Sequence, residues 1–144
     1  MRPSTTKLFN ANKIISDLEI KVNEQGEKLQ SFITNDASTQ ETQEYRKAFS
    51  DFRLVENNSF EFSLHGNKFK SQIEFVALER KAIIKTYAVD IDLKNHPNLI
   101  LTHIPNLDVL IDTVGNVSFR EGGLPLHEVG LDYFGAVVNH IYPV

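Results

Sequence analysis

The chain has 144 residues, of which 41% are hydrophobic, and its 15 basic and 19 acidic side chains give a formal net charge of −4. It contains no cysteine, which excludes disulfides, thiolate nucleophiles and thiolate-bound metal centres. The basic residues are scattered and no apolar run is long enough for a signal peptide or a bilayer span. We therefore expect one cytoplasmic domain, residues 1–144, that binds neither nucleic acid nor membrane and uses no cofactor or metal.

The amphipathic N-terminal zone, residues 7–35, is compatible with two structures. Its apolar residues follow a heptad that only Gln25 interrupts, which favours one long helix. The heptad positions are Leu8, Ala11, Ile15, Leu18, Val22, Leu29 and Phe32. Residues 18–22 also alternate between apolar and polar, and residues 23–26 suit a hairpin loop. We favour the helix.

Length limits how such a helix can be accommodated. About 28 helical residues span roughly 42 Å, whereas a compact globule of this size is roughly 37 Å across. An unbroken helix would overhang the rest of the domain. We therefore expect it either to bend near Gly26 or to pack against a second copy of the chain, as a homodimer through this zone.

The second zone, residues 38–93, begins with a helix signal. Ser38 and Glu41 form a capping box, and apolar residues then recur at helical spacing. These residues are Tyr45, Ala48, Phe49 and Phe52. We predict a helix from about Thr39 to Arg53 whose aromatic stripe faces the core.

An antiparallel β-meander is expected to follow, from about residue 60 to residue 93. Apolar and polar residues alternate on both sides of Gly66-Asn67, a dipeptide typical of two-residue hairpin turns. A turn at these residues sets Leu64 opposite Phe69 and Phe60 opposite Ile73. Both strands then agree on the face that is buried.

The third strand of the meander sets the remaining pairs. Its apolar residues are Ile83, Tyr87, Val89, Ile91 and Leu93, and we predict that they share the buried face. That register pairs Ile73 with Tyr87, and it also gives two ion pairs across the outer face. These pairs are Lys70 with Asp90 and Lys68 with Asp92. We therefore interpret the two aspartates as part of a charge-complementary surface and not as a metal site or an acid–base pair.

The C-terminal zone, residues 95–144, contains a hairpin or a helix and then a closing helix. Residues 105–121 begin with proline and carry an apolar helical stripe, but they also fit a hairpin with its turn at Gly115-Asn116, between residues 109–112 and 117–119. We lean to the hairpin because of its β-branched content. From Pro125 to Ile141 a broad apolar stripe predicts a buried helix, ended by Pro143.

Candidate functional residues are few. The histidines do not occur at the spacing of zinc ligands, and no serine-hydrolase, phosphate-loop or dinucleotide motif is present. If the meander and the closing helix enclose a pocket, then His103, His127 or Tyr133 would lie at its mouth as ligand or partner contacts. No catalytic residue can be assigned.

One stretch resembles a known family. Residues 122–127, Gly-Gly-Leu-Pro-Leu-His, followed by Gly130-Leu131-Asp132-Tyr133, look like the glycine–proline loop that enters the last helix of SecB-type export chaperones. Pro105-Asn106-Leu107 resembles the start of their long helix. The resemblance covers the C-terminal third, and Asp132-Tyr133 departs from the usual Asn-Phe. It implies a helix over residues 105–121 and an oligomer that holds unfolded clients.

These observations predict an α+β fold, in which N-terminal helices and a C-terminal helix pack on one face of an antiparallel β-meander. For function, the acidic charge, the small size and the absence of catalytic motifs favour a non-enzymatic protein-interaction module, such as an inhibitor, an immunity-type protein or an adaptor, with a protein partner. The alternatives are a small-ligand-binding pocket protein or enzyme, and a SecB-like holdase chaperone.

Overall fold

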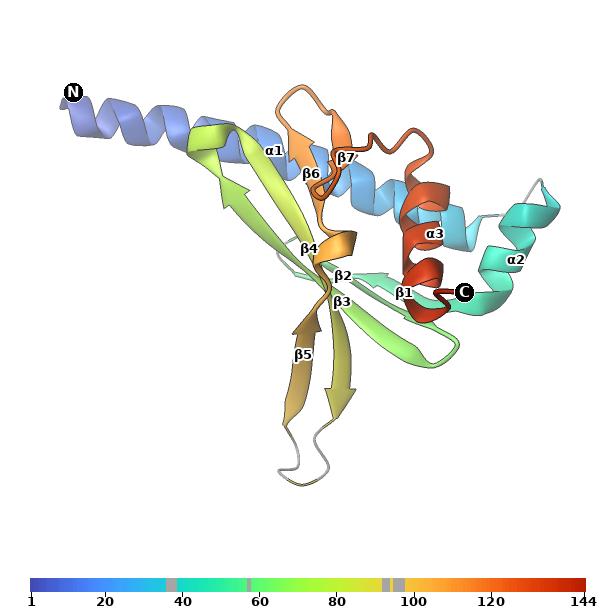
Figure 1. Ribbon diagram of the computed structural model, residues 1–144. Coiled ribbons are helices and arrows are strands. Elements are labelled where there is room, and N and C mark those ends of the chain that lie inside the picture. The colour runs from blue at the N-terminus through green and yellow to red at the C-terminus, as the bar shows by residue number, and fades with distance from the viewer. Residues whose placement is uncertain (36–38, 57, 92–93, 95–97) are drawn as a thin grey trace.

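The computed structural model describes residues 1–35, 39–56, 58–91, 94 and 98–144. It has the expected α+β architecture (Figure 1), with a long N-terminal helix, a seven-stranded antiparallel sheet and a C-terminal helix. The elements are α1 (Pro3–Thr34), α2 (Gln40–Ala48), β1 (Phe49–Leu54), β2 (Phe60–Leu64), β3 (Asn67–Val76), η1 (Ala77–Glu79), β4 (Lys81–Ile91), β5 (Leu99–His103), η2 (Pro105–Leu107), β6 (Val109–Asp112), β7 (Val117–Phe119) and α3 (Val129–Ile141).

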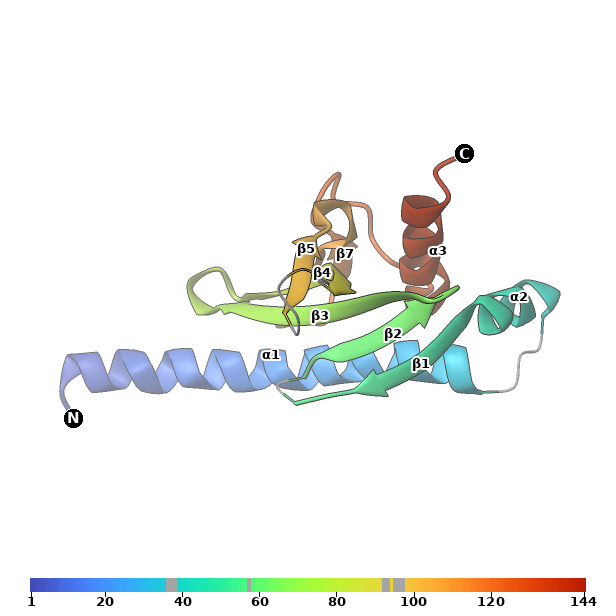
Figure 2. The same ribbon diagram turned by 90° about the horizontal axis from the view of Figure 1, so that it is seen from below.

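The N-terminal zone is one helix, as favoured, and the hairpin alternative is excluded. α1 starts with Pro3 in its first turn and continues through Gly26 to Thr34. Gly26 is buried so closely that a Cβ there would lie 3.1 Å from Leu54 Cδ2. Figures 1 and 2 both show the N-terminal turns extending beyond the sheet. The helix therefore overhangs the body, and only its C-terminal half enters the core.

The predicted helix over residues 39–53 is only half correct. α2 is capped by Thr39, whose hydroxyl accepts the Thr42 N–H at 3.1 Å, while Ser38 lies outside the described residues. The helix ends at Ala48, and β1 follows. A β-bulge, with Asp51 at φ 57°, shifts the register between Ser50 and Arg53. An extra residue in a strand reverses the side-chain alternation that follows it.

The bulge explains why the helical pattern was misleading. Phe49 and Phe52 are three residues apart, and yet both contact Phe62 and Phe134 on the core side of the sheet. In a regular strand, residues three apart point to opposite faces. The bulge thus gives a strand the apolar spacing of a helix.

The sheet is a half-barrel with the strand order β1-β2-β3-β4-β6-β7, and β5 pairs with the part of β4 beyond β6. Its core face packs on α1 and α3, which also contact each other, so the helices that form the core lie on one face as predicted. The largest fully buried side chains include Leu18 and Val22 from α1, Phe60, Phe62, Leu64, Phe69 and Ile111 from the sheet, and Tyr133, Phe134 and Val137 from α3.

The register of the first hairpin differs from the prediction by two residues. The turn residues are His65 and Gly66, with φ of 46° and 82°, and Phe69 pairs with Phe62 instead of Leu64. Positive φ at both central residues defines the tight turn that fits twisted strands. Because the shift is two residues, each side chain stays on its predicted face. Phe60 accordingly lies near Ser71, whose hydroxyl accepts the Phe60 N–H at 2.8 Å, and not opposite Ile73.

The predicted register of β3 with β4 is wrong by an odd number of residues. Ile73 pairs with Ile84 instead of Tyr87, so the core face of β4 is Ala82, Ile84, Thr86 and Ala88. The loop is shorter than predicted because η1 ends at Arg80, which takes a left-handed conformation (φ 56°). Lys70 faces Tyr87 and Lys68 faces Val89. The predicted pair of Lys70 with Asp90 is therefore absent, and Asp92 and Leu93 lie outside the described residues.

The C-terminal zone forms the favoured hairpin. β6 and β7 pair antiparallel, so the helix that the SecB-type resemblance implies for residues 105–121 is wrong. The Asp112 carboxylate closes the turn by accepting the N–H groups of Val114, Gly115 and Asn116 at 2.9–3.0 Å. Burial raises the pKa of Asp112, but these hydrogen bonds outweigh burial, and the net pKa lies below its ordinary value.

The closing helix begins later than predicted. Pro125 pairs with Ser118 as an extension of the sheet, and α3 starts at Val129. The Asp132 side chain accepts the N–H groups of His127 and Glu128 at 2.9 and 3.1 Å, which holds the chain where it enters the helix. Within the described ranges, no helix combines the length and the apolar character needed to cross a membrane.

Candidate functional site

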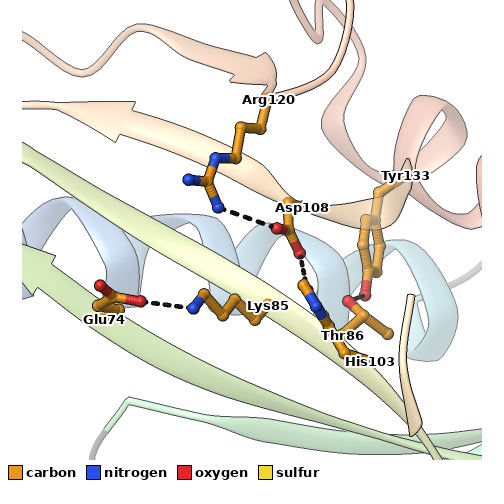
Figure 3. Close-up of polar contacts among 7 residues, drawn as sticks. All are labelled: Glu74, Lys85, Thr86, His103, Asp108, Arg120 and Tyr133. Carbon is orange, nitrogen blue, oxygen red and sulfur yellow. Dashed lines mark hydrogen bonds and ion pairs between the residues drawn. The ribbon is translucent and has the colours of Figure 1, made fainter. Parts of the chain in front are cut away.

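The most organised polar cluster centres on Asp108, which is only 1% exposed (Figure 3). Its carboxylate lies 2.7 Å from His103 Nε2 and 3.4 Å from Arg120 Nη1, and its backbone oxygen accepts the Arg120 N–H at 2.8 Å. His103 ends β5, Asp108 follows the η2 turn that Pro105 starts, and Arg120 follows β7. The cluster therefore ties the ends of β5, η2 and β7 together at the base of β5.

Charged and aromatic side chains of β3 and β4 flank this cluster. Lys85 lies 2.6 Å from Glu74, and the hydrogen bond between them raises the pKa of Lys85 and lowers that of Glu74. The ring of Tyr87 packs 5.2 Å from the ring of His103. Figure 3 shows Glu74 and Lys85 on strands beside the cluster.

The arrangement can orient an imidazole. When the Asp108 carboxylate accepts the Nε2–H of His103, it fixes the tautomer in which Nδ1 carries a lone pair. A nucleophilic triad would also need a hydroxyl or thiol bonded to that imidazole, and the described residues place none there. The His103–Asp108 pair therefore supplies two of the three groups that such a triad needs. The same pair anchors the base of β5.

The structure does not bring the three predicted site residues together. Tyr133 is inside the core, where its hydroxyl bonds to Thr86 Oγ1 at 2.5 Å and burial raises its pKa. His103 packs on Tyr87, which follows Thr86 in β4. Adjacent residues of a strand point to opposite faces, so Tyr87 and His103 lie on the other side of the sheet from Thr86 and Tyr133. His127 is exposed, with its backbone N–H bonded to Asp132. The three residues thus do not line one pocket mouth.

The interior space between α1, the sheet and α3 is nearly filled. A cavity between α1, the sheet and α3 is lined by Gln25, Leu29, Phe60 and Tyr133, among others, and leaves about 10 Å³ open to water. That is about the room for one water molecule. Gln25 Oε1 is buried without a hydrogen-bond partner among the described residues.

The described residues form no cluster suited to a metal ion, and the outer face of the sheet carries an ion-paired carboxylate. In the described part of the chain, no group of three or more histidine and acidic side chains is placed to hold a metal ion. On the outer face, Glu61 is paired with Arg53 at 2.9 Å and Lys68 at 3.7 Å. The hydrogen bond from Arg53 holds the pKa of Glu61 below its usual range. The Glu61 carboxylate is therefore paired with cations of its own face.

The feature that sequence reasoning missed is a projecting β-ribbon, which we call the arm: residues 87–91 of β4 paired with β5, residues 99–103. Figure 1 shows it extending away from the body. Its large apolar side chains are exposed: Ile91 by 60%, Leu99 by 63%, Ile100 by 47% and Leu101 by 39%. The uninterrupted Leu99-Ile100-Leu101 run was the available signal, since neither face of such a strand is polar.

A second apolar surface lies on the overhanging turns of α1. Leu8 and Phe9 are 63% and 65% exposed, although Leu8 belongs to the heptad stripe that is buried further along at Leu18 and Val22. The stripe thus continues past the edge of the body, and these two side chains are left largely uncovered by the described residues. Exposed apolar groups that gather at projecting features, rather than singly, typically mark contact surfaces.

Comparisons with known proteins assign no relative. No protein-family model matches the chain, and neither the curated proteins nor the solved structures give a significant match.

Proposed function

We propose that the chain is a cytoplasmic protein-interaction module, of the inhibitor, immunity-type or adaptor kind, and that the arm is its principal contact surface. The observation that supports this proposal is the exposure of Ile91, Leu99, Ile100 and Leu101 on a ribbon that projects from a filled core. Beyond Val89, the last residue of β4 that pairs with β3, the arm has only two strands, and a two-stranded ribbon is marginally stable in water by itself. An arm of this composition is therefore better suited to a bound state than to free solution.

The energetics indicate what kind of contact the arm makes. The four side chains are each about half exposed, and burying the remainder would contribute on the order of 4 kcal/mol in total. Association costs roughly 4–15 kcal/mol in lost translational and rotational freedom. Side-chain burial alone is therefore too weak, and the partner must also engage the backbone edge of β5 or a second surface such as the α1 overhang.

Site-specific photo-cross-linking in the native cell tests the proposal. A photoreactive amino acid is placed at Leu99 on the arm, at Phe9 on the overhang, or at Leu78 in η1 as a control. Leu78 is 98% exposed on the body, so it matches the other sites in chemistry but not in position. We expect a discrete cross-linked species from Leu99 and none from Leu78. Equal background from both sites would refute the proposal.

A second candidate function, small-ligand binding or catalysis at His103, draws on one observation, the imidazole oriented by buried Asp108. A metabolite-library thermal-shift screen with the wild type and the His103→Ala variant tests it. A hit that stabilises the wild type and is lost in the variant would support this candidate. If every hit stabilises both proteins equally, His103 is structural.

The holdase alternative now rests only on the sequence resemblance of residues 122–133. The long helix that the resemblance implied for residues 105–121 is a hairpin instead. The holdase alternative predicts that the chain suppresses aggregation of an unfolded client at near-stoichiometric amounts. Unchanged client aggregation, followed by light scattering, would dismiss it.

A further inference from the structure

We infer that the arm's partner is a second copy of this chain, and that two β5 strands pair antiparallel about a two-fold axis through Leu101. The inference rests on the proposed function, because it assumes that the arm is a contact surface. Three features of the arm support it: the direction of its free hydrogen-bonding groups, the absence of protection on its edge, and the way its sequence matches itself when reversed.

The first feature follows from the register of β4 with β5. Ile104 N–H donates to Thr86 O at 2.9 Å, and the register continues from there with Tyr87 opposite His103. Hydrogen-bonded and non-hydrogen-bonded pairs alternate along an antiparallel ladder. Ile100 and Thr102 therefore bond to β4, whereas the N–H and C=O groups of Leu99, Leu101 and His103 point to the free edge.

The second feature is that this edge is unprotected while the edges of the terminal strands β1 and β7 are protected. β1 carries the bulge at Asp51 and the charged Arg53, and the edge of β7 is covered by the chain that follows, through Phe119 N–H to Leu124 O and Leu126 N–H to Val117 O, both at 2.9 Å. β5 is Leu-Ile-Leu-Thr-His, with no proline and no lysine. Proteins usually protect edge strands with a bulge, a charge or a cover, so an edge without any of these is suited to pairing.

The third feature is self-complementarity. With the two-fold axis at Leu101, Leu101 faces Leu101 of the second copy and Leu99 faces His103, so all three outward-pointing residues of each strand are paired and up to about six backbone hydrogen bonds form. Asp90, the charged residue of the arm, lies on β4, across the ribbon from Ile100, so no like charges meet at the new junction. The two β5 strands then join the sheets of the two copies into one continuous sheet, and they extend the part of each arm beyond Val89 that is otherwise only two-stranded.

A charge-swap experiment tests the register. Sedimentation velocity is measured for the full chain, for Leu101→Lys, for Leu101→Glu and for an equimolar mixture of the two variants. We expect the wild type to be dimeric and each variant to dissociate about tenfold more readily, because like charges face each other at the axis. The mixture should recover a heterodimer, because lysine then faces glutamate.

Position 99 provides the matched control. Leu99 faces His103 of the second copy and not itself, so mixing Leu99→Lys with Leu99→Glu should give no preference for the heterodimer. Far-UV circular dichroism checks that every variant is folded. If Leu101→Lys does not fold, hydrogen exchange of the wild-type amides at 99, 101 and 103 tests the same junction without a substitution.

The outcomes separate this inference from the proposed function. A wild type that is monomeric at every concentration overturns the second-copy inference, while a cross-link from Leu99 to a different protein would leave the interaction function standing. A dimer that persists unchanged in both Leu101 variants also overturns it and points to the α1 overhang. A monomer with no cross-link from Leu99 refutes both.

Discussion

Replacing Gly130 with alanine tests the contact between α1 and α3. A Cβ at this position would lie 2.5, 2.6 and 2.8 Å from Phe32 Cγ, Cβ and Cδ2, distances that real Cβ contacts do not adopt. Phe32 has little freedom to move away, because its ring packs 5.7 Å from Tyr45 and 5.8 Å from Phe134. The helices would have to separate.

The size of the effect follows from two opposing contributions. Overpacking a filled site costs about 1–3 kcal/mol, whereas alanine in place of glycine favours a helix by up to about 1 kcal/mol. We expect Gly130→Ala to lower the free energy of unfolding by about 1–2 kcal/mol. Gly135 in the same helix is the control, because its added Cβ would meet only the Tyr45 hydroxyl, at 3.2 Å, which is a much milder contact than those at Gly130. Gly135→Ala should be neutral or slightly stabilising.

Urea unfolding followed by far-UV circular dichroism measures both variants, and a double-mutant cycle identifies the cause. Gly130→Ala should add little destabilisation in a Phe32→Ala background, since the clashing ring is gone, which gives a coupling free energy of about 1 kcal/mol or more. A Gly130→Ala protein as stable as the wild type, or additive effects in the cycle, would refute the close packing of α1 on α3.

Four further variants probe the core, the overhang, the buried polar pair and the β6–β7 turn by the same urea assay. Leu18→Ala should cost about 2–5 kcal/mol because Leu18 is fully buried, while Leu8→Ala on the overhang should change the stability by less than about 0.5 kcal/mol; equal effects would contradict the overhang. Tyr133→Phe should cost about 1–3 kcal/mol by leaving the Thr86 hydroxyl unpaired, and an unchanged midpoint would mean that this hydrogen bond contributes nothing. The pKa of Asp112 is lowered by folding, so its carboxylate stabilises the fold above the ordinary value of 3.8 and this contribution is lost as the pH falls through the folded pKa; the advantage of the wild type over Asp112→Asn should therefore shrink in acid, and a pH-independent difference would contradict the assignment.

The sequence predicted the correct element wherever the local signals and the pattern of buried residues agree. The α1 heptad, the Gly115-Asn116 turn and the stripe of α3 each lead to the element observed, because the residues that specify the local structure also face the core. The overall α+β arrangement, with the core helices on one face, follows from these elements. The overhang was also foreseeable, because it depends only on helix rise and domain size.

The predicted register of β4 was wrong because polar residues are buried there and apolar residues are exposed. Ser71 and Thr86 are completely buried, whereas Ile91 is 60% exposed, since it lies beyond Val89, the last residue of β4 that pairs with β3. A prediction that places the apolar residues of β4 in the core therefore selects the wrong face of the strand. The buried polar residues are explained by Tyr133 and by the backbone of Phe60, which supply their hydrogen-bond partners from elements far away in the sequence.

The candidate site was missed for a related reason. Asp108 resembles an ordinary turn residue in the sequence, and its contacts with His103 and Arg120 depend on η2 and β7 folding back over the base of β5. The arm carries no motif, because its exposure results from the absence of a neighbouring strand. Sequence patterns describe the residues of a strand but not which of its edges remains open.

Hydrogen exchange at the backbone amides of Leu99, Leu101 and His103 tests the central claim, that the free edge of the arm pairs with a second copy, most directly. The account predicts that these amides are protected at high protein concentration and that protection falls on dilution, in step with the dissociation measured by sedimentation. Fast exchange at these amides at every concentration, while the amides of Ile100 and Thr102 stay protected by β4, would show an unpaired edge and contradict the account.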